Sequence, residues 1–212
     1  GIYTENGDIT INSANLTIAA GGVGIFAQTY NESEDADIPS AITMENSSVN
    51  ITADGDAAVF CGTGGIIVDD TVLSTECYKG DASDDYSYAS YSLYSEGNIT
   101  ISGDNTVINA DDGVGISADE VLKIEGGTVN VDSSNGALFG WNGITISGGN
   151  VNVSSVAGSA ILAREGALNI TGENTSVTAT SNDASVATVR NFKDGGIYLD
   201  MSYIDVANTA DG

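Results

Sequence analysis

A short segment of alternating apolar residues recurs along this chain at a nearly constant interval, and that repeat limits what the chain can fold into. Its clearest copies span residues 7–11, 97–101, 142–146 and 167–170, and the first of them reads Gly-Asp-Ile-Thr-Ile. Weaker copies lie at 42–44, 66–68, 122–124 and 197–199. Where no insertion intervenes, the distance from the start of one copy to the start of the next is 22 to 24 residues. A period of this size is typical of solenoids, in which one coil cannot bury its apolar side chains alone and neighbouring coils stack into one core.

Two further short segments follow in each repeat. The second carries alternating apolar pairs, at Leu16/Ile18, Val49/Ile51, Val129/Val131, Val151/Val153 and Ile204/Val206, with further copies near Val107 and Val177. Alternation with a period of two predicts a strand with one buried face. The third segment recurs at 24–27, 58–61, 92–95, 115–118, 137–140, 160–163 and 185–188. Gly- and Asn-rich connectors between the first two segments, such as residues 147–150, suit tight corners.

These observations predict an all-β fold, a right-handed single-stranded parallel β-helix of about eight coils with three short strands each. Right-handed winding is the strong default for parallel β connections. An antiparallel sandwich also has short strands at regular spacing, but it does not repeat the identities of strands and corners at a fixed step. We expect a single domain over residues 1–212, as a segment of a longer surface protein.

Two insertions, at about residues 28–41 and 76–91, stretch the spacing between copies of the first segment to 33 residues. Long loops on a rigid scaffold often carry function. The alternative is that each insertion is an ordinary solvated excursion.

The balance of charge excludes several classes of partner. The 212 residues include 30 acidic and five basic residues, for a formal net charge of −25. Binding to DNA or RNA depends on clustered Lys and Arg, so we expect no nucleic acid partner. The apolar runs are only a few residues long, so we expect no membrane insertion.

Parallel β-helices include polysaccharide lyases and hydrolases, so catalysis is a remote alternative. Lyase chemistry requires a basic residue beside calcium-binding acids, and none of the basic residues has such an acidic trio in the repeat alignment. A hydrolase of this fold needs carboxylates on neighbouring coils, and the sequence also lacks histidine. The acidic pairs Asp69-Asp70 and Asp111-Asp112 instead fall at different corners of different coils. We therefore expect no enzyme and no catalytic residues.

The third segment predicts an aromatic stripe along the rod. The second residue of each copy is apolar, and we take it to face inward: Ile25, Val59, Leu93, Ile116, Leu138, Ile161 and Val186. The residue after it then faces outward: Phe26, Phe60, Tyr94, Ser117, Phe139, Leu162 and Ala187. Aromatic faces stack on the apolar faces of sugar rings. We therefore name as candidate ligand-binding residues Phe26, Phe60, Tyr94 and Phe139, together with Trp141 and the loop tyrosines Tyr78, Tyr86, Tyr88 and Tyr91. Two alternatives remain open: both consecutive positions point inward at a corner, or the long loops cover the stripe.

Calcium is the one metal that the sequence supports, and we expect no organic cofactor. Hard cations prefer several carboxylate and carbonyl oxygens. Two acidic groups in the insertions have such ligands at short spacing, namely Glu32, Glu34, Asp35 and Asp37 in the first and Asp81, Asp84 and Asp85 in the second. The alternative is that a surface with 30 acidic residues contains such groups by chance.

The two cysteines, Cys61 and Cys77, are 16 residues apart and do not identify a compartment. Cys61 lies on a line of small residues in the third segment, which predicts a small buried side chain. A bond between the two thiols remains open at this point.

The strings at 97–103 and 143–153, the second reading Gly-Ile-Thr-Ile-Ser-Gly-Gly-Asn-Val-Asn-Val, resemble the repeats of bacterial cell-surface β-helix proteins. Among these they are similar to the carbohydrate-binding β-helix family of anaerobic Firmicutes, and the resemblance covers nearly the whole chain. It implies binding of acidic polysaccharide or cellulose and an association with calcium.

We expect a secreted or cell-surface bacterial module that is not catalytic and that binds an extracellular glycan or host-surface ligand, as an adhesin does. The alternative is a structural spacer or stalk segment of a larger adhesin without a ligand of its own.

Overall fold

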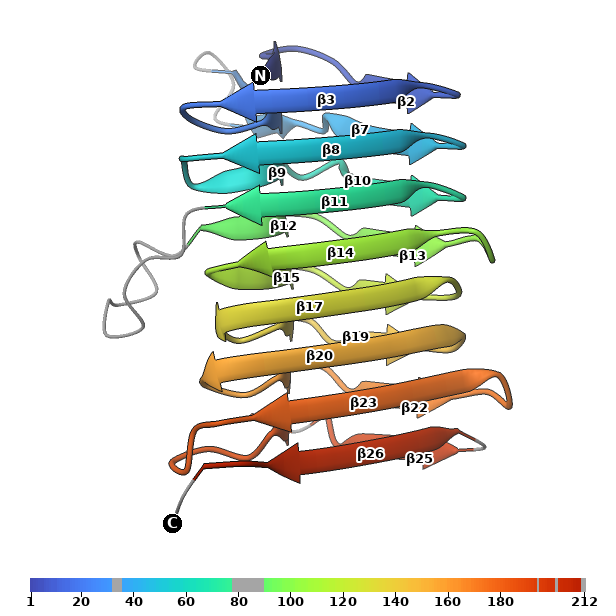
Figure 1. Ribbon diagram of the computed structural model, residues 1–212. Helices are drawn as coiled ribbons and strands as arrows, with labels where there is room; N and C mark the ends of the chain where they lie inside the picture. The colour runs from blue at the N-terminus through green and yellow to red at the C-terminus, as the bar shows by residue number, and fades with distance from the viewer. Residues whose placement is uncertain (32–35, 78–89, 194, 201, 211–212) are drawn as a thin grey trace.

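The computed structural model describes residues 1–31, 36–77, 90–193, 195–200 and 202–210, and it places all but two of their strands in three parallel sheets of eight strands each (Figure 1). Sheet A contains β1 (Ile2–Thr4), β4 (Ile25–Ala27), β9 (Ala57–Cys61), β12 (Tyr91–Ser95), β15 (Val114–Ala118), β18 (Leu138–Gly140), β21 (Ile161–Ala163) and β24 (Val189–Asn191). Sheet B contains β2 (Ile9–Asn12), β7 (Ala41–Glu45), β10 (Gly65–Asp69), β13 (Ile99–Ser102), β16 (Leu122–Ile124), β19 (Ile144–Ile146), β22 (Leu168–Thr171) and β25 (Ile197–Asp200). Sheet C contains β3 (Asn15–Ala20), β8 (Ser48–Ala53), β11 (Val72–Cys77), β14 (Val107–Asp112), β17 (Thr128–Asn135), β20 (Gly149–Ala157), β23 (Thr175–Ser181) and β26 (Tyr203–Asn208).

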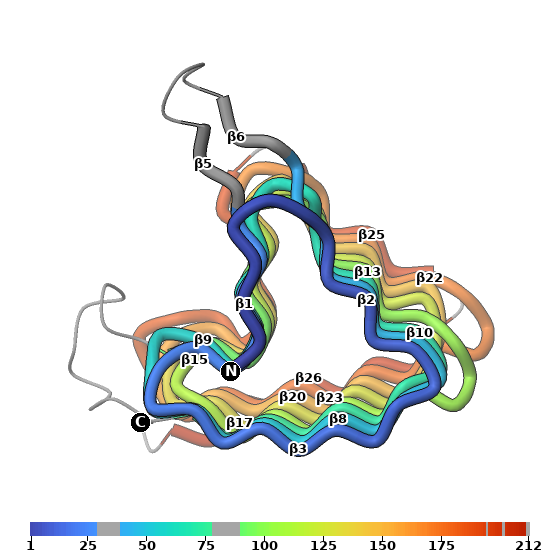
Figure 2. The backbone as a smooth tube through the Cα atoms, turned by 90° about the horizontal axis from the view of Figure 1, so that it is seen from above, coloured from blue at the N-terminus to red at the C-terminus, as the bar shows by residue number. Residues whose placement is uncertain are grey.

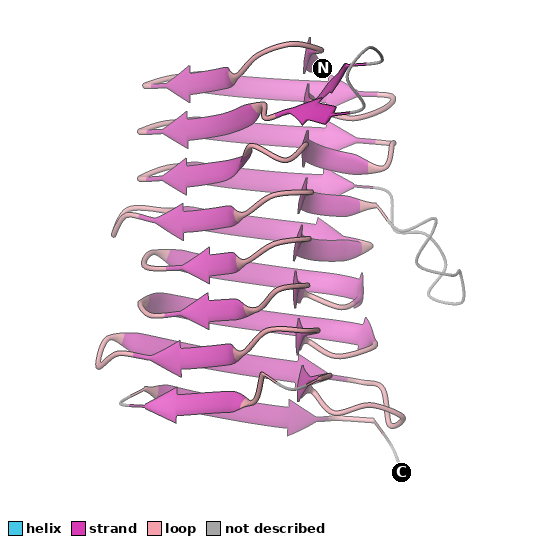
Figure 3. Cartoon of the chain, turned by 180° about the vertical axis from the view of Figure 1, so that it is seen from behind, coloured by secondary structure: helices cyan, strands magenta, loops and turns pink. Residues whose placement is uncertain are grey.

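The chain visits sheets A, B and C in turn and then begins the next coil, so the cross-section is triangular (Figure 2). Seen from the N-terminal end, the chain runs clockwise as it recedes, which makes the winding right-handed (Figure 2). Every regular element in the described residues is a strand (Figure 3). Accordingly, this part of the chain has no helix with the length and apolar character needed to cross a membrane. The predicted fold class, a parallel β-helix with three strands per coil, is confirmed.

The core is a set of like-on-like rows inside the triangle. On sheet B, the first inward position is apolar in every described coil and is buried in the first seven: Ile9, Ile42, Ile66, Ile99, Leu122, Ile144 and Leu168. Stacking at about 4.8 Å brings each of these side chains against its equivalents in the coils above and below. Because each fully buried side chain of this size contributes roughly 1.5–3 kcal/mol, the repeat itself stabilises the rod.

The corner between sheets B and C shows why glycine recurs there. Gly149 has a φ of +84°, and a Cβ atom on it would lie 2.4 Å from the carbonyl oxygen of Gly127 on the previous coil. Left-handed backbone and close stacking of coils both exclude a side chain at this position.

The last strand of sheet A, β24, differs from the sequence prediction for the last copy of the third segment. Val189, not Val186, pairs with Ile161, so Arg190 follows Leu162 on the outer face where Ala187 was expected. Val186 follows Ser185 and Val189 follows Thr188, so both valines fit the pattern of the third segment. Only the register in which the coils stack selects between them. On sheet C, likewise, Ile108 rather than Val107 is the buried inward residue of its coil.

The two predicted insertions interrupt the regular coils. The first lies between β4 and β7 and contains an antiparallel pair, β5 (Thr29–Asn31) and β6 (Ala36–Ile38). The second lies between β11 and β12, and residues 78–89 of it are outside the described part of the chain.

Candidate functional site

The outward positions of sheet A form a row that runs the length of the rod. Strand pairing sets its members side by side in eight successive coils, and we call the following set the aromatic row: Tyr3, Phe26, Phe60, Tyr94, Ser117, Phe139, Leu162 and Arg190. The four aromatic residues predicted for this stripe, Phe26, Phe60, Tyr94 and Phe139, are all half-buried rather than buried. The row therefore presents ring surface to solvent.

The first three rings of the aromatic row are stacked on one another, and the fourth is tilted against the third. The ring centroids of Tyr3 and Phe26 are 5.1 Å apart with planes 18° from parallel, and those of Phe26 and Phe60 are 4.9 Å apart at 12°. Tyr94 continues the stack at 5.3 Å from Phe60, with its plane tilted by 46°. Since the centroid spacing of Tyr3, Phe26 and Phe60 matches the distance between coils and their planes are nearly parallel, the faces of these three rings point largely along the rod.

A second row runs beside the first, made by the residue that directly follows each strand of sheet A. We call this the corner row, and its members from the second coil onward are Gln28, Gly62, Glu96, Asp119, Trp141, Arg164 and Phe192. The backbone N–H of each donates to a carbonyl of the previous coil, for example Trp141 to Ala118 at 2.9 Å and Arg164 to Gly140 at 3.0 Å. The corner row is therefore held as regularly as the strands themselves.

The two rows enclose a groove of about 440 Å³ over the middle and later coils of sheet A. Its lining includes rings, both arginines of the chain and one carboxylate; the members used below are Tyr91, Tyr94, Ser117, Asp119, Phe139, Trp141, Arg164, Arg190 and Phe192. This volume lies in the range of roughly 300–1,000 Å³ that is usual for small-molecule sites. Four of the residues predicted from the sequence, Tyr91, Tyr94, Phe139 and Trp141, thus meet in one groove.

Positive charge is concentrated in this groove although the protein is strongly acidic. The guanidinium carbon of Arg164 lies 3.9 Å from the centroid of the Trp141 ring, and that of Arg190 lies 4.7 Å from the Phe192 ring. Within the described residues neither guanidinium forms an ion pair, whereas Lys193 pairs with Glu165 at 2.5 Å. The ring faces hold the two guanidinium groups in place while their N–H donors stay available to a ligand.

Tyr94 and Asp119 connect the two rows. The Tyr94 hydroxyl donates to Asp119 Oδ2 over 2.8 Å. Burial, together with this hydrogen bond, raises the pKa of the Tyr94 hydroxyl, so the group stays protonated. The bond uses one acceptor position of the carboxylate and leaves others for a ligand hydroxyl.

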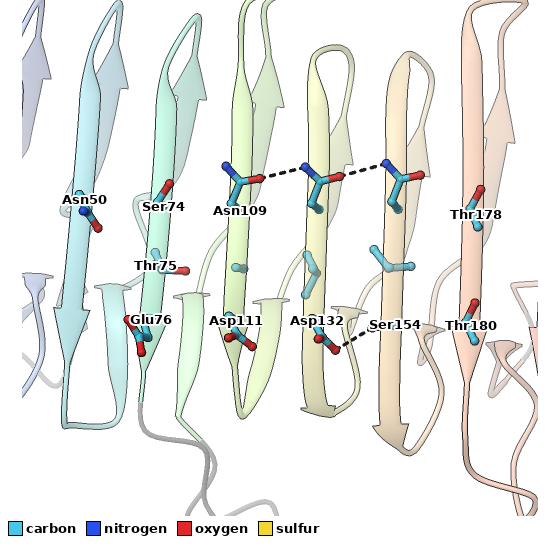
Figure 4. Close-up of a pocket in the computed structure, with 15 residues that line it drawn as sticks. Asn50, Ser74, Thr75, Glu76, Asn109, Asp111, Asp132, Ser154, Thr178 and Thr180 are labelled. Atoms are coloured by element: carbon cyan, nitrogen blue, oxygen red, sulfur yellow. Dashed lines mark hydrogen bonds between the residues drawn. The ribbon is translucent and has the colours of Figure 1, made fainter. Parts of the chain in front are cut away.

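Sheet C carries a larger, shallower hollow of about 590 Å³ with different chemistry (Figure 4). Asn152 donates to Asn130 at 3.0 Å, and Asn130 donates to Asn109 at 2.9 Å, so three amides form a ladder across consecutive coils. None of the described residues that line this hollow is aromatic or basic. The surface can form hydrogen bonds but offers no ring for stacking, and we regard the groove on sheet A as the better site.

A buried carboxylate lies at the base of the second insertion. Asp112 is 0% exposed, and its oxygens accept hydrogen bonds from the Thr75 hydroxyl at 2.9 Å and from the backbone N–H of Cys77. Ser92, at the start of β12, lies 2.7 Å from Thr75 through the two hydroxyl oxygens. Asp112 therefore joins the end of β11 to β12, the strand that carries Tyr91 and Tyr94.

Both cysteines are free and buried. The Cys61 thiol contacts the carbonyl oxygens of Ser40 at 2.9 Å and Gly65 at 3.1 Å, as expected for a small inward residue. The bond between Cys61 and Cys77 that the sequence left open is not formed.

A family model described as "Carbohydrate-binding domain-containing protein" matches residues 69–209, which is more than half of the chain. The chain belongs to this family. The matched range contains every described residue that lines the groove on sheet A, including Trp141 and both arginines. No curated protein and no solved structure matches the chain.

Several predicted residues are not tested by the structure of this family member. Nine of them lie outside the described residues: Tyr78, Tyr86, Tyr88, Glu32, Glu34, Asp35, Asp81, Asp84 and Asp85. The side chain of Asp37 in β6 is likewise not described. Within the described part of the chain, no three His, Cys, Asp or Glu side chains are grouped so as to hold a metal ion. The calcium sites in the two insertions stay predictions.

Sequence reasoning missed the three charged residues among the described members of the groove. Arg164 and Asp119 follow strands of sheet A directly, so a search of the residue after each third segment finds them. Arg190 was missed because the expected register placed Ala187 at this position of the aromatic row. No sequence signal distinguishes these two registers.

Proposed function

We propose that this chain is a non-catalytic glycan-binding module, and that it holds carboxylate-bearing sugars in the groove on sheet A. The observation that carries the proposal is the combination of ring faces and two guanidinium groups in one groove of a protein with a net charge of −25. Aromatic faces bind the apolar faces of sugar rings, and planar guanidinium groups bind carboxylates through two parallel hydrogen bonds.

The arginines favour an acidic polysaccharide over cellulose, the two ligands implied by the family resemblance. A neutral glucan gains little from two cations, whereas a uronate needs them to overcome the repulsion of the acidic protein surface. The aromatic faces serve both kinds of sugar equally.

Most glycosidases depend on a pair of carboxylates that both face the substrate. Asp119 is the only acidic residue among the described residues that line the groove, and Glu96, its neighbour in the corner row, accepts a hydrogen bond from the side chain of Gln28 instead. Binding without bond cleavage is the chemistry that this set of side chains supports. As part of the same proposal, the module acts in a secreted or surface-attached bacterial protein, where polysaccharides are available ligands.

Calorimetric titration of the native chain with oligogalacturonides and with cello-oligosaccharides, in calcium and again in EDTA, tests this proposal. We expect binding of the uronates and no release of new reducing ends. Trp141→Ala should weaken binding about tenfold, and Ile67→Ala, which removes an exposed apolar side chain from sheet B, should leave it unchanged. Absence of binding to every glycan would instead favour a structural spacer.

A further inference from the structure

The corner row changes its sign of charge along the rod. Its members in the fourth to eighth coils are, in order, Glu96, Asp119, Trp141, Arg164 and Phe192. The backbone N–H of each donates to a carbonyl of the coil before it, so consecutive members lie one coil apart, or about 4.8 Å. Both carboxylates therefore precede Trp141 along the rod, and the arginine follows it.

The opposite charges of the groove are not paired with each other. Within the described residues, Arg164 and Arg190 form no ion pair, although Asp119 lines the same groove. Arg164 contacts Trp141 instead, and Arg190, in the eighth coil of the aromatic row, contacts Phe192. The stretch from Asp119 to Arg190 covers three coil steps, roughly 14 Å. A glycan lying along the rod over this stretch therefore meets a carboxylate with one sugar and a guanidinium with another.

The acidic end of the groove carries a carboxylate that is held in place. The Tyr94 hydroxyl donates to Asp119 Oδ2 over 2.8 Å. Burial raises the pKa of this hydroxyl most, and the hydrogen bond to Asp119 and the charges of Asp119 and Glu96 raise it further. Glu96 thus adds negative charge at this end, while its side chain accepts a hydrogen bond from Gln28 at 3.1 Å. A sugar at this end can donate its hydroxyls to Asp119, whereas a sugar carboxylate is repelled.

We propose that the groove on sheet A selects a glycan in which an uncharged sugar adjoins an acidic one, with the uncharged sugar beside Asp119 and the acidic sugar beside the two arginines. The inference rests on the proposed function and adds the ligand class, a mixed acidic and neutral polysaccharide. A chain with a carboxylate on every sugar brings one of them against Asp119, and a neutral chain brings none to the guanidinium groups. Specificity of this kind uses repulsion of the wrong ligand as well as attraction of the right one.

Three β-1,4-linked trisaccharides test this preference, because they differ only in how many glucose units are oxidised to glucuronate. Cellotriose has no glucuronate, the second probe has one at its non-reducing end, and the third is oxidised on every sugar. In calorimetric titrations of the native chain, we expect the singly oxidised trisaccharide to bind about tenfold or more tightly than either of the other two. Because Trp141 is the only tryptophan, its fluorescence gives a second measure of occupancy.

Asp119→Asn removes the repulsion and keeps an oxygen that accepts the hydrogen bond from Tyr94. We expect it to raise the affinity for the fully oxidised trisaccharide, so that the preference for the singly oxidised one over it falls to about threefold or less. The matched control is Glu125→Gln, which changes the net charge equally but lies at an exposed position after β16 of sheet B and should keep the native preference. Thermal unfolding establishes that both variants keep the fold, and Asp119→Ser replaces the asparagine variant if that one is destabilised.

A native preference for the fully oxidised trisaccharide would overturn the selection of a mixed glycan. A preference that Asp119→Asn leaves unchanged, or that Asp119→Asn and Glu125→Gln lower equally, would overturn it as well, since Asp119 would then have no role of its own. In each of these cases, loss of binding in Trp141→Ala would show that the proposed function stands. If the native chain binds neither acidic trisaccharide, the proposed function itself is wrong.

Discussion

The guanidinium group of Arg164 lies over the ring of Trp141, with 3.9 Å between its central carbon and the ring centroid. The two residues come from consecutive positions of the corner row, so the contact depends on the stacking of two coils and not on local sequence. Because the guanidinium contacts the ring and forms no ion pair within the described residues, its N–H donors stay available to a ligand in the groove. This arrangement suits recognition of a planar carboxylate.

Arg164→Gln should therefore reduce affinity for an oligouronate while leaving any affinity for a neutral oligosaccharide unchanged. Loss of a charge-assisted hydrogen bond costs about 1.5–3 kcal/mol, which corresponds to about a tenfold or larger change in dissociation constant. The matched control is Lys123→Gln, which changes the net charge equally but lies on sheet B. Equal losses in both variants, measured by calorimetry, would mean that only the overall charge matters.

Asp112 predicts a pH dependence of stability. Burial raises the pKa of its carboxyl above the ordinary value of 3.8, and the hydrogen bonds from Thr75 and Cys77 only partly oppose this effect. The folded state therefore holds the proton more tightly than the unfolded state. The resulting stabilisation is fully present below pH 3.8 and is lost as the pH rises through the higher folded-state value.

Urea unfolding of the native chain and of Asp112→Asn between about pH 3 and pH 8 measures this contribution, because the other carboxylates cancel in the difference. We expect the native chain to lose stability relative to Asp112→Asn as the pH rises, and parallel curves would contradict the assignment. Asp112→Ala should cost about 1–3 kcal/mol at neutral pH, since the N–H of Cys77 then lacks an acceptor.

The two thiols should be unreactive in the folded protein. Burial raises the pKa of Cys61 to about 11, and burial together with the nearby Asp112 raises the pKa of Cys77 further. Little thiolate is present at about pH 8, and solvent access is low. A colorimetric thiol reagent should label both cysteines only after denaturation, without added reductant. Rapid labelling of the folded chain would show that the thiols are accessible, and a mass lower by two hydrogens would show that they are bonded.

The corner glycines can be tested by a matched pair. Gly149→Ala should destabilise the rod by about 1–3 kcal/mol or more, since the residue combines positive φ with close approach to Gly127. Gly21→Ala should leave the free energy of unfolding unchanged or slightly higher, because no atom lies within 4 Å of its added methyl group. Similar effects in both variants would argue against tight stacking at the corner.

The inward rows of the rod were predictable wherever the sequence pattern allows only one face of the strand to be buried. Ile144 and Ile146 alternate with Thr145, and only one of the two faces can enter the core without burying a hydroxyl. In the last coil, by contrast, Val186 and Val189 are both apolar residues beside small ones. The pairing of Val189 with Ile161 decides between them, and this pairing brings Arg190 into the groove.

The sequence by itself determined the coil period, the inward rows and the presence of an aromatic row, because each follows from alternation within one repeat. Only the tertiary structure decided that Tyr94 bonds to Asp119 and that Arg164 lies over Trp141. Each of these relationships joins residues that are far apart in the sequence and lie on different coils. Their contact depends on the register in which whole coils stack, and no single repeat contains that register.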